Sequence, residues 1–191
     1  MPTPERFEKM KKVVSYRQAN LSIILDDIYD PFNISAIFRT CDALGIKEVF
    51  IVNPPDGFKA SKSVCMRCDK WLEVYKSDNR KEIYDRVHEK GYKIYGTILE
   101  KESHDFRELD VDEPVCIVLG NEHAGLCEES VSLCDELIYV PMYGFVQSFN
   151  VSVTAAIVLS NIVFRREASE KNCYISESEQ NNILETWGKS L

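Results

Sequence analysis

Short apolar runs alternate with amphipathic segments along most of this 191-residue chain, and this alternation limits its fold more than any other feature. Apolar runs of four to eight residues indicate strands, and apolar residues at helical spacing indicate the helices between them. Strands that alternate with helices build a mostly parallel sheet with helices on both faces. We therefore expect an α/β fold in a single domain, with a mostly parallel sheet flanked by helices.

The predicted elements follow from this spacing and from the residues that end each segment. Expected strands are Leu21–Ile28, Glu48–Asn53, the segment ending in WLEVYKS, Lys93–Leu99, Val115–Gly120 and the segment ELIYVP. Expected helices are Ile34–Leu44, closed by Gly45, then Asn79–Lys90, a short helix near Glu128–Leu133 and a long helix after Asn150. The polar end of the chain predicts a short terminal helix that docks through Trp187.

Length and composition favour one soluble domain. A chain of 191 residues with 45% hydrophobic residues can bury a full core without disulfides or metals. The longest apolar stretch, Val151–Phe164, is interrupted by polar residues and is shorter than the roughly 18 residues of a membrane span. The N-terminus lacks an apolar signal region, so we expect a cytoplasmic protein that does not bind membranes.

The charge is unevenly distributed, although the whole chain carries −8. The segment Pro4–Gln18 predicts an amphipathic helix, and residues 1–20 carry +3 while the remainder carries −11. A local basic surface is what RNA phosphates require, although a solvated helix face would give the same pattern. Candidate RNA-binding residues are Arg6, Lys9, Lys11, Lys12 and Arg17. We divide the chain into this helix (1–20), a main domain (21–166) and a tail (167–191).

Seven cysteines do not form a recognisable framework. Their number is odd, and only Cys65 and Cys68 form a CxxC pair. A lone CxxC is a weak signal for metal or redox chemistry. We interpret the cysteines mainly as structural thiols and expect no bound metal.

Three polar loops follow predicted strands or lead into helices, where ligands bind in open α/β sheets. The first contains Asn33 before a helix and Arg39 beside its apolar stripe; a helix cap and a surface arginine are the alternative interpretation. The second, GNEHAGL, presents Glu122 between Gly120 and Gly125, which permit a tight turn.

The third loop, PMYGFVQSFNVS, holds Ser148 and Asn150, either of which could simply cap the following helix. The chain has no GxGxxG fingerprint and no GxxxxGK[ST] phosphate loop, which disfavours a Rossmann dinucleotide site and an NTPase. Its three histidines are scattered. A site without an obvious strong base suits chemistry in which a cofactor supplies the driving force.

Together, NISAIFRTCDALG, IVLGNEHAGL and VPMYGFVQSFNVSVTAAI resemble the three motifs of the TrmH (SpoU-type) branch of the SPOUT methyltransferases. The resemblance covers about Leu21 to Arg165. It implies methylation of a ribose 2′-hydroxyl in RNA by S-adenosylmethionine, in a homodimer. With the basic helix, it is greatest to tRNA enzymes that act on guanosine 18 of the D-loop. It also implies a deep trefoil knot, an exception among folds, at about 97–164.

The resemblance also implies roles for single residues. Cofactor contacts fall on Thr97, Gly120, Val140, Met142 and Phe149, and the catalytic and RNA-facing cluster on Asn33, Arg39, Glu122, Ser148 and Asn150. The chain departs from the family in VCMRCDKW, which changes an expected RNA-facing loop at 61–70, in Phe149 where leucine is usual, and in its short acidic tail. Ribosomal RNA, a tRNA wobble ribose and a non-catalytic RNA-binding module remain alternatives.

Overall fold

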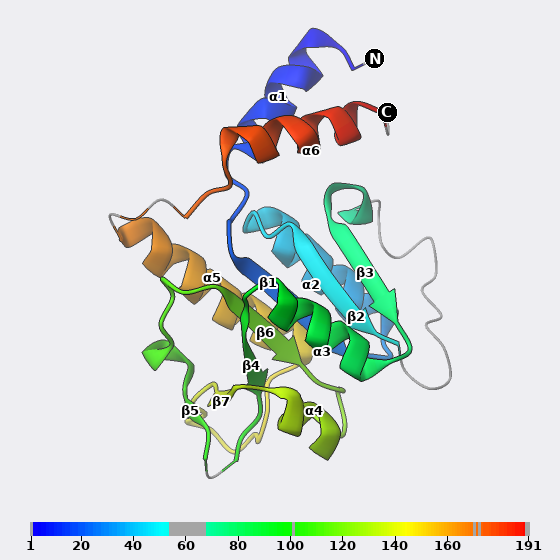
Figure 1. The fold of residues 1–191 in the computed structure, drawn as a ribbon. Helices are drawn as coiled ribbons and strands as arrows, with labels where there is room; N and C mark the ends of the chain where they lie inside the picture. Colours follow the sequence, from blue (N-terminus) through cyan, green and yellow to red (C-terminus); the bar gives the residue numbers. More distant parts are fainter. Residues whose placement is uncertain (1, 54–67, 101, 170, 172, 190–191) are drawn as a thin grey trace.

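The computed structural model describes residues 2–53, 68–100, 102–169, 171 and 173–189. Its centre is a seven-stranded sheet in the order β3-β2-β1-β6-β4-β7-β5 (Figure 1). Every pairing between these strands is parallel, which confirms the predicted fold class. The strands are β1 (Leu21–Asp26), β2 (Glu48–Val52), β3 (Glu73–Ser77), β4 (Lys93–Thr97), β5 (His104–Asp105), β6 (Val115–Leu119) and β7 (Glu136–Tyr139).

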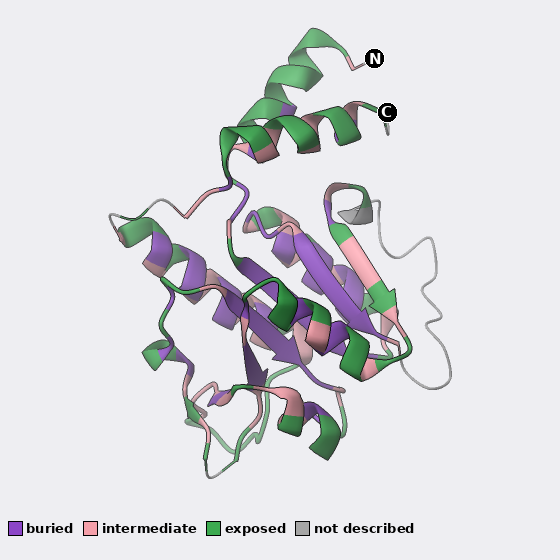
Figure 2. Cartoon of the chain, viewed as in Figure 1, coloured by how far each residue is buried: buried purple, intermediate pink, exposed green. Residues whose placement is uncertain are grey.

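Helices cover both faces of the sheet because side chains of the central strands point alternately to either side. Leu21, Ile23 and Leu25 of β1 pack with the helices α2 (Pro31–Ala43) and α5 (Val151–Ala168). Ile24 faces the other way, toward the core beneath α3 (Arg80–Glu89). All six residues of β1 are buried, as in a strand covered on both sides (Figure 2).

Three further helices complete the described part of the chain apart from two short 3-10 turns, Cys68–Trp71 and Phe106–Glu108. The helix α4 (Glu128–Leu133) has the predicted bounds. The helices α1 (Pro4–Val14) and α6 (Glu177–Lys189) pack against one another to one side of the sheet (Figure 1). Trp187 is buried in their shared core, as the sequence predicts.

The structure corrects several predicted boundaries. The helix α1 ends at Val14 rather than Gln18, and β1 ends at Asp26 rather than Ile28. The helix α2 begins at Pro31, and its N-cap is Asp30, whose side chain accepts a hydrogen bond from the Phe32 amide. Asn33 therefore lies inside the first turn and is not the cap. The short strand β5 is absent from the predicted elements.

The turn after α2 fixes the N-terminal segment against the domain. Gly45 has a φ of +76°, and a Cβ there would lie 2.2 Å from the Tyr16 carbonyl oxygen. Its own carbonyl accepts a 2.8 Å hydrogen bond from the Gln18 amide. Glycine is required here because of both the left-handed backbone and the close approach.

The predicted structural thiols are confirmed in part. Cys41 and Cys116 are buried, whereas Cys127 is exposed, and all three are free. Burial raises the pKa of the Cys41 thiol to about 12. Cys65 of the CxxC pair lies outside the described residues, so the prediction about that pair stays a prediction. Most of the expected RNA-facing loop at 61–70 also lies outside them.

Candidate active site

A cavity of about 260 Å³ opens where β4, β6 and β7 end at their carboxyl termini. This is the edge at which open parallel sheets bind ligands. Its walls come from the ends of these strands, the loop after β6 and the segment before α5. All five residues predicted to contact a cofactor line it: Thr97, Gly120, Val140, Met142 and Phe149.

The loop after β6 forms a tightly closed turn along this cavity. Asn121 and Gly125 exchange two backbone hydrogen bonds of 2.9 Å. A Cβ on Gly120 would lie 2.5 Å from the Gly125 carbonyl carbon, so the turn closes only around glycine. The result is a pocket with apolar side chains beside backbone polar groups, a lining that is typical of small-molecule and cofactor sites.

Glu122 joins this turn to the start of α2. Its carboxylate accepts hydrogen bonds from the backbone amides of Tyr29, at 3.4 Å, and Asp30, at 3.1 Å. Its Oε1 also accepts a 3.0 Å bond from the side-chain amide of Asn33. Burial raises the pKa of Glu122, but the bonds from Asn33 and the backbone outweigh it and hold the pKa below 4.5.

Asn33 connects the same cluster to the third polar loop. Its Oδ1 accepts a 3.0 Å hydrogen bond from Nδ2 of Asn150. Asn150 is also the N-cap of α5, since its Oδ1 accepts from the Ser152 amide at 2.8 Å. The capping interpretation of Asn150 is thus correct, and the residue additionally ties α5 to α2. Segments more than 100 residues apart meet at one point.

Ser148 and Arg39 complete the predicted cluster in different ways. Ser148 lines the cavity together with Glu122. Arg39 is exposed on α2, lies outside the residues that line the cavity, and makes no hydrogen bond or ion pair with any part of the chain that the structure describes. Its guanidinium is therefore available to a ligand that approaches from outside.

The predicted RNA-binding residues divide into two groups. Arg6, Lys9, Lys11 and Lys12 are exposed on α1. Arg17 is fully buried, with its guanidinium 2.7 Å from Asp42 and bonded to backbone carbonyl oxygens. The expectation that Arg17 contacts RNA is wrong, because this charge is already paired inside the protein.

Sequence reasoning missed three participants in the site. The amides of Tyr29 and Asp30 hold Glu122, and Asn121 organises the turn through its side chain, which accepts from the His123 and Ala124 amides. The Asp30-Pro31 pair was the available signal, because aspartate before a proline at the first helical position is typical of an N-cap. No comparable signal indicated Asn121.

The described ranges hold neither a metal-binding cluster nor a membrane-spanning helix. No three histidine, cysteine, aspartate or glutamate side chains gather there in a group able to hold a metal ion. Of the described helices, none combines the length and apolar character needed to cross a membrane.

Comparison with known proteins assigns the three meeting segments to a family. The family model described as the SpoU rRNA Methylase family matches residues 20–160, well over half of the chain. This chain belongs to the SpoU methylase family. The match contains every residue of the Asn33, Glu122 and Asn150 cluster and the whole cavity.

Curated relatives share most of the chain with this SpoU family member. The tRNA (guanosine(18)-2′-O)-methyltransferase of Thermus thermophilus is 37% identical over 157 residues, which cover 82% of this chain and 81% of that protein. The Escherichia coli (strain K12) protein of the same name is 32% identical over 185 residues, with 95% and 81% coverage.

Solved structures agree with the fold. The A. aeolicus TrmH/SpoU tRNA modifying enzyme superimposes with a TM-score of 0.87 at 34% identity, covering 97% of this chain and 96% of that chain. The SpoU methyltransferase AviRb from Streptomyces viridochromogenes, solved in complex with AdoMet, gives 0.71 at 25% identity, with 88% and 67% coverage.

Proposed function

We propose that this chain transfers a methyl group from S-adenosylmethionine to the ribose 2′-hydroxyl of guanosine 18 in the D-loop of tRNA. The observation that carries the proposal is the junction of Glu122, Asn33 and Asn150 beside a cavity lined by all five predicted cofactor residues. The names of the relatives from Thermus and Escherichia support the choice of tRNA and of guanosine 18.

The residues of the cavity fit the cofactor by shape and chemistry. The closed turn after Gly120 brings backbone groups to the cavity wall, while Val140, Met142 and Phe149 line the cavity with apolar side chains. Thr97 also lines the cavity, with its hydroxyl bonded to the Val118 carbonyl at 2.7 Å. When bound, S-adenosylmethionine supplies an electrophilic methyl group on a positively charged sulfur, so no metal is needed to activate it.

Arg39 is the residue we assign to the reacting hydroxyl. A guanidinium has a pKa above about 12 and is a poor base near neutral pH, so we assign it an electrostatic role. It would hold the ribose oxygen and its neighbouring phosphate while an O–CH₃ bond forms and the CH₃–S bond breaks. The hydroxyl proton would pass to that phosphate or to water.

The other polar residues orient the reactants. Asn33 and Asn150 hold α2 and α5 together, and Glu122 ties the cavity turn to them. Ser148, at the cavity rim, would contact the ribose. These contacts would hold the ribose between the cofactor and Arg39, and they would raise the rate by orienting the reacting groups.

We also propose that the enzyme works as a homodimer with a knotted core. Apolar side chains stand exposed before and along α5, among them Phe145, Val153 and Phe164, and a second copy would cover them. The deep trefoil knot at about 97–164 is proposed from the resemblance of the three motifs to the family. In this scheme residues 1–20 recruit RNA, 21–166 catalyse, and 167–191 support the first helix.

One assay tests the proposed function. Purified protein, transcribed tRNA and cofactor with a labelled methyl group should yield one methylated ribose, mapped to position 18. A transcript with 2′-deoxyguanosine at that position is the matched control and should accept no label. Label at the wobble ribose or on ribosomal RNA would favour those alternatives. In a separate measurement by calorimetry, the protein should still bind S-adenosylmethionine in the presence of a chelator, because we propose no metal in the site.

A further inference from the structure

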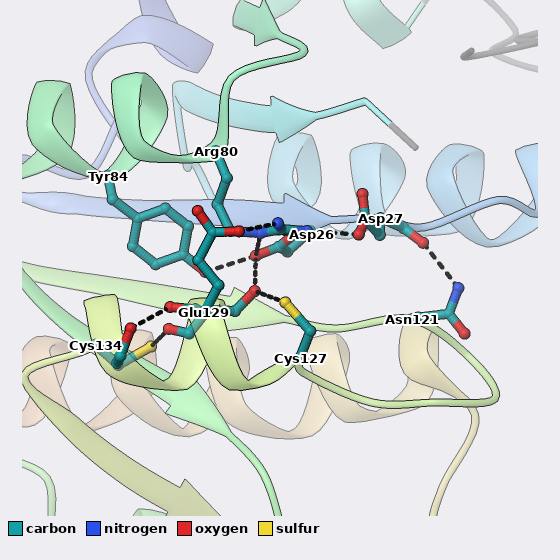
Figure 3. Close-up of polar contacts among 10 residues, drawn as sticks. Asp26, Asp27, Arg80, Tyr84, Asn121, Cys127, Glu129 and Cys134 are labelled. Atoms are coloured by element: carbon teal, nitrogen blue, oxygen red, sulfur yellow. Dashed lines mark hydrogen bonds and ion pairs between the residues drawn. The ribbon is translucent and has the colours of Figure 1, made fainter. Parts of the chain in front are cut away.

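A buried cluster of polar side chains lies beside the cavity without lining it. Its centre is Asp26, the last residue of β1, which is only 3% exposed. The hydroxyls of Tyr84 and Ser130 donate hydrogen bonds of 2.7 and 2.6 Å to Asp26 Oδ2 (Figure 3). A carboxylate buried to this degree needs compensating charge as well as donors.

Arg80, the first residue of α3, supplies this charge to several elements at once. Its Nε lies 3.1 and 3.2 Å from the two oxygens of Asp26, and one terminal nitrogen lies 2.5 Å from Asp27. The other terminal nitrogen lies 2.9 Å from Glu129 of α4. A guanidinium can serve several acceptors simultaneously because its donors form a rigid planar fork (Figure 3).

The adjacent residue Asp27 has an unusual backbone. Its φ is +55°, in the left-handed region that residues other than glycine seldom adopt. This conformation turns the chain from β1 toward α2, and it persists where surrounding contacts hold it. Burial raises the pKa of Asp27, Arg80 lowers it, and Asp26 raises it again. Without Arg80, two neighbouring carboxylates would repel each other at this turn.

The turn is in direct contact with the cavity loop. The carbonyl oxygen of Asp27 accepts a 2.9 Å hydrogen bond from Nδ2 of Asn121 (Figure 3). The Oδ1 of Asn121 accepts from the amides of His123 and Ala124, at 2.9 and 3.0 Å. Asn121, His123 and Ala124 all line the cavity, so the side chain of Asn121 connects the turn to the cavity wall.

We propose that Arg80 is a positioning residue for the S-adenosylmethionine site. By holding Asp26 and Asp27, it fixes the turn whose carbonyl anchors Asn121, and Asn121 in turn fixes the cavity loop. Arg80 acts entirely through these residues and does not reach the cavity. The inference rests on the proposed function, because that function identifies the ligand of the cavity.

The first test needs no cofactor. Amide hydrogen exchange compares the wild-type chain, Arg80→Met and a control, Lys81→Met, which removes an exposed cation from the same helix. In Arg80→Met the amides of His123, Ala124 and Gly125 should exchange about tenfold faster or more, because local opening becomes easier there. Amides in the middle of β6 should be unchanged, and the control should match wild type throughout.

The second test measures the dissociation constant of S-adenosylmethionine by calorimetry on the same proteins. Arg80→Met should bind about tenfold or more weakly, because small displacements of a preorganised site are costly. The double variant Arg80→Met/Asp27→Asn should recover part of this loss. Asparagine tolerates the left-handed backbone and removes one of the two adjacent charges.

Each result decides the proposal. If the cavity-loop amides of Arg80→Met exchange at the wild-type rate and the variant binds S-adenosylmethionine with wild-type affinity, the proposed role of Arg80 is wrong. The proposed function of the chain would stand. If wild-type protein binds no S-adenosylmethionine, the proposed function fails and the inference fails with it. If Arg80→Met does not fold, Arg80→Lys is judged by the same two measurements, because an ammonium keeps the charge and loses the fork.

Discussion

The side-chain amide of Asn33 donates a 3.0 Å hydrogen bond to Oε1 of Glu122, joining the first turn of α2 to the loop after β6. The same Asn33 accepts from Asn150, so one amide uses its two ends to join three segments. An amide suits this position because it is both donor and acceptor. Asn33 is 8% exposed, so losing either partner would leave a polar atom unsatisfied in a largely buried position.

The pKa of Glu122 leads to a prediction about pH and stability. Because this pKa is lowered in the folded protein, the ionised carboxylate stabilises the fold fully above the ordinary value of 4.5. The contribution should be lost as the pH falls through the lowered folded pKa. Near neutral pH, Glu122→Gln should reduce the free energy of unfolding by about 1 kcal/mol, the scale of one typical hydrogen bond, because the site is only half-buried and the amide keeps an acceptor oxygen.

Urea unfolding of both proteins across the acidic range measures this difference. The difference in free energy of unfolding between wild type and Glu122→Gln should be constant above pH 4.5 and should become smaller below it. Glu185→Gln, at an exposed carboxylate on α6, is the control and should change little. A gap that widened as the pH fell would contradict the assignment of the amides as the stabilising partners.

The exposed apolar residues around α5 predict the effect of charge on assembly. Phe164 is 60% exposed on this helix, and Phe145 stands fully exposed before it. Phe164→Glu should shift sedimentation toward a monomer, because a carboxylate buried between copies is unfavourable. Val13→Asp, which charges an apolar side chain on α1, should leave the assembly unchanged. A wild-type chain that is fully active as a monomer would contradict the dimer proposal.

The exposed lysines of α1 predict a salt effect on RNA binding. Replacing Lys9, Lys11 and Lys12 with alanine should weaken tRNA binding and reduce the slope of log affinity against log salt by about two to three, near one unit for each lost phosphate contact. Titrations at several salt concentrations measure the slope. Lys81→Ala on α3 is the control, and an unchanged slope in the triple variant would leave α1 with a structural role only.

Much of the fold could be predicted because it depends on local patterns. The strands β2 and β6 differ from their predicted ranges by one residue, and α4 matches its prediction. Apolar periodicity predicts such elements well when the pattern is compatible with a helix or with a strand but not with both. The strand β5 was missed because only two residues pair with β7, and so short a segment has no periodicity.

The site was predictable in its side chains and much less so in its connections. The resemblance implied that Glu122, Asn150 and Asn33 share one cluster, but the residues alone did not show that Asn33 would form hydrogen bonds with both of the others. For Arg17 the sequence predicted the wrong partner. This basic residue of a basic segment was expected to contact RNA, but it is paired with Asp42 inside the protein. Long-range hydrogen bonds depend on tertiary packing, and single-sequence periodicity contains no information about partners 90 residues away.

Replacing Arg39 should separate catalysis from stability. Arg39 is exposed and unpaired within the described structure, so Arg39→Ala should change the free energy of unfolding by no more than about 0.5 kcal/mol. Turnover on tRNA should fall about 10²–10³-fold, as expected for one lost electrostatic stabiliser, with cofactor affinity nearly unchanged. Arg39→Lys should restore only part of the rate, because an ammonium cannot make the bidentate contact.

Single-turnover methylation with saturating tRNA and cofactor measures this rate, and calorimetry measures cofactor binding. Arg86→Ala removes an exposed arginine from α3 and should methylate at the wild-type rate. A decrease confined to tRNA affinity, with normal single-turnover chemistry, would make Arg39 a binding residue for phosphate. An Arg39→Ala protein that folds, binds both ligands and methylates at nearly the wild-type rate would instead leave Arg39 as an ordinary arginine on the surface of α2.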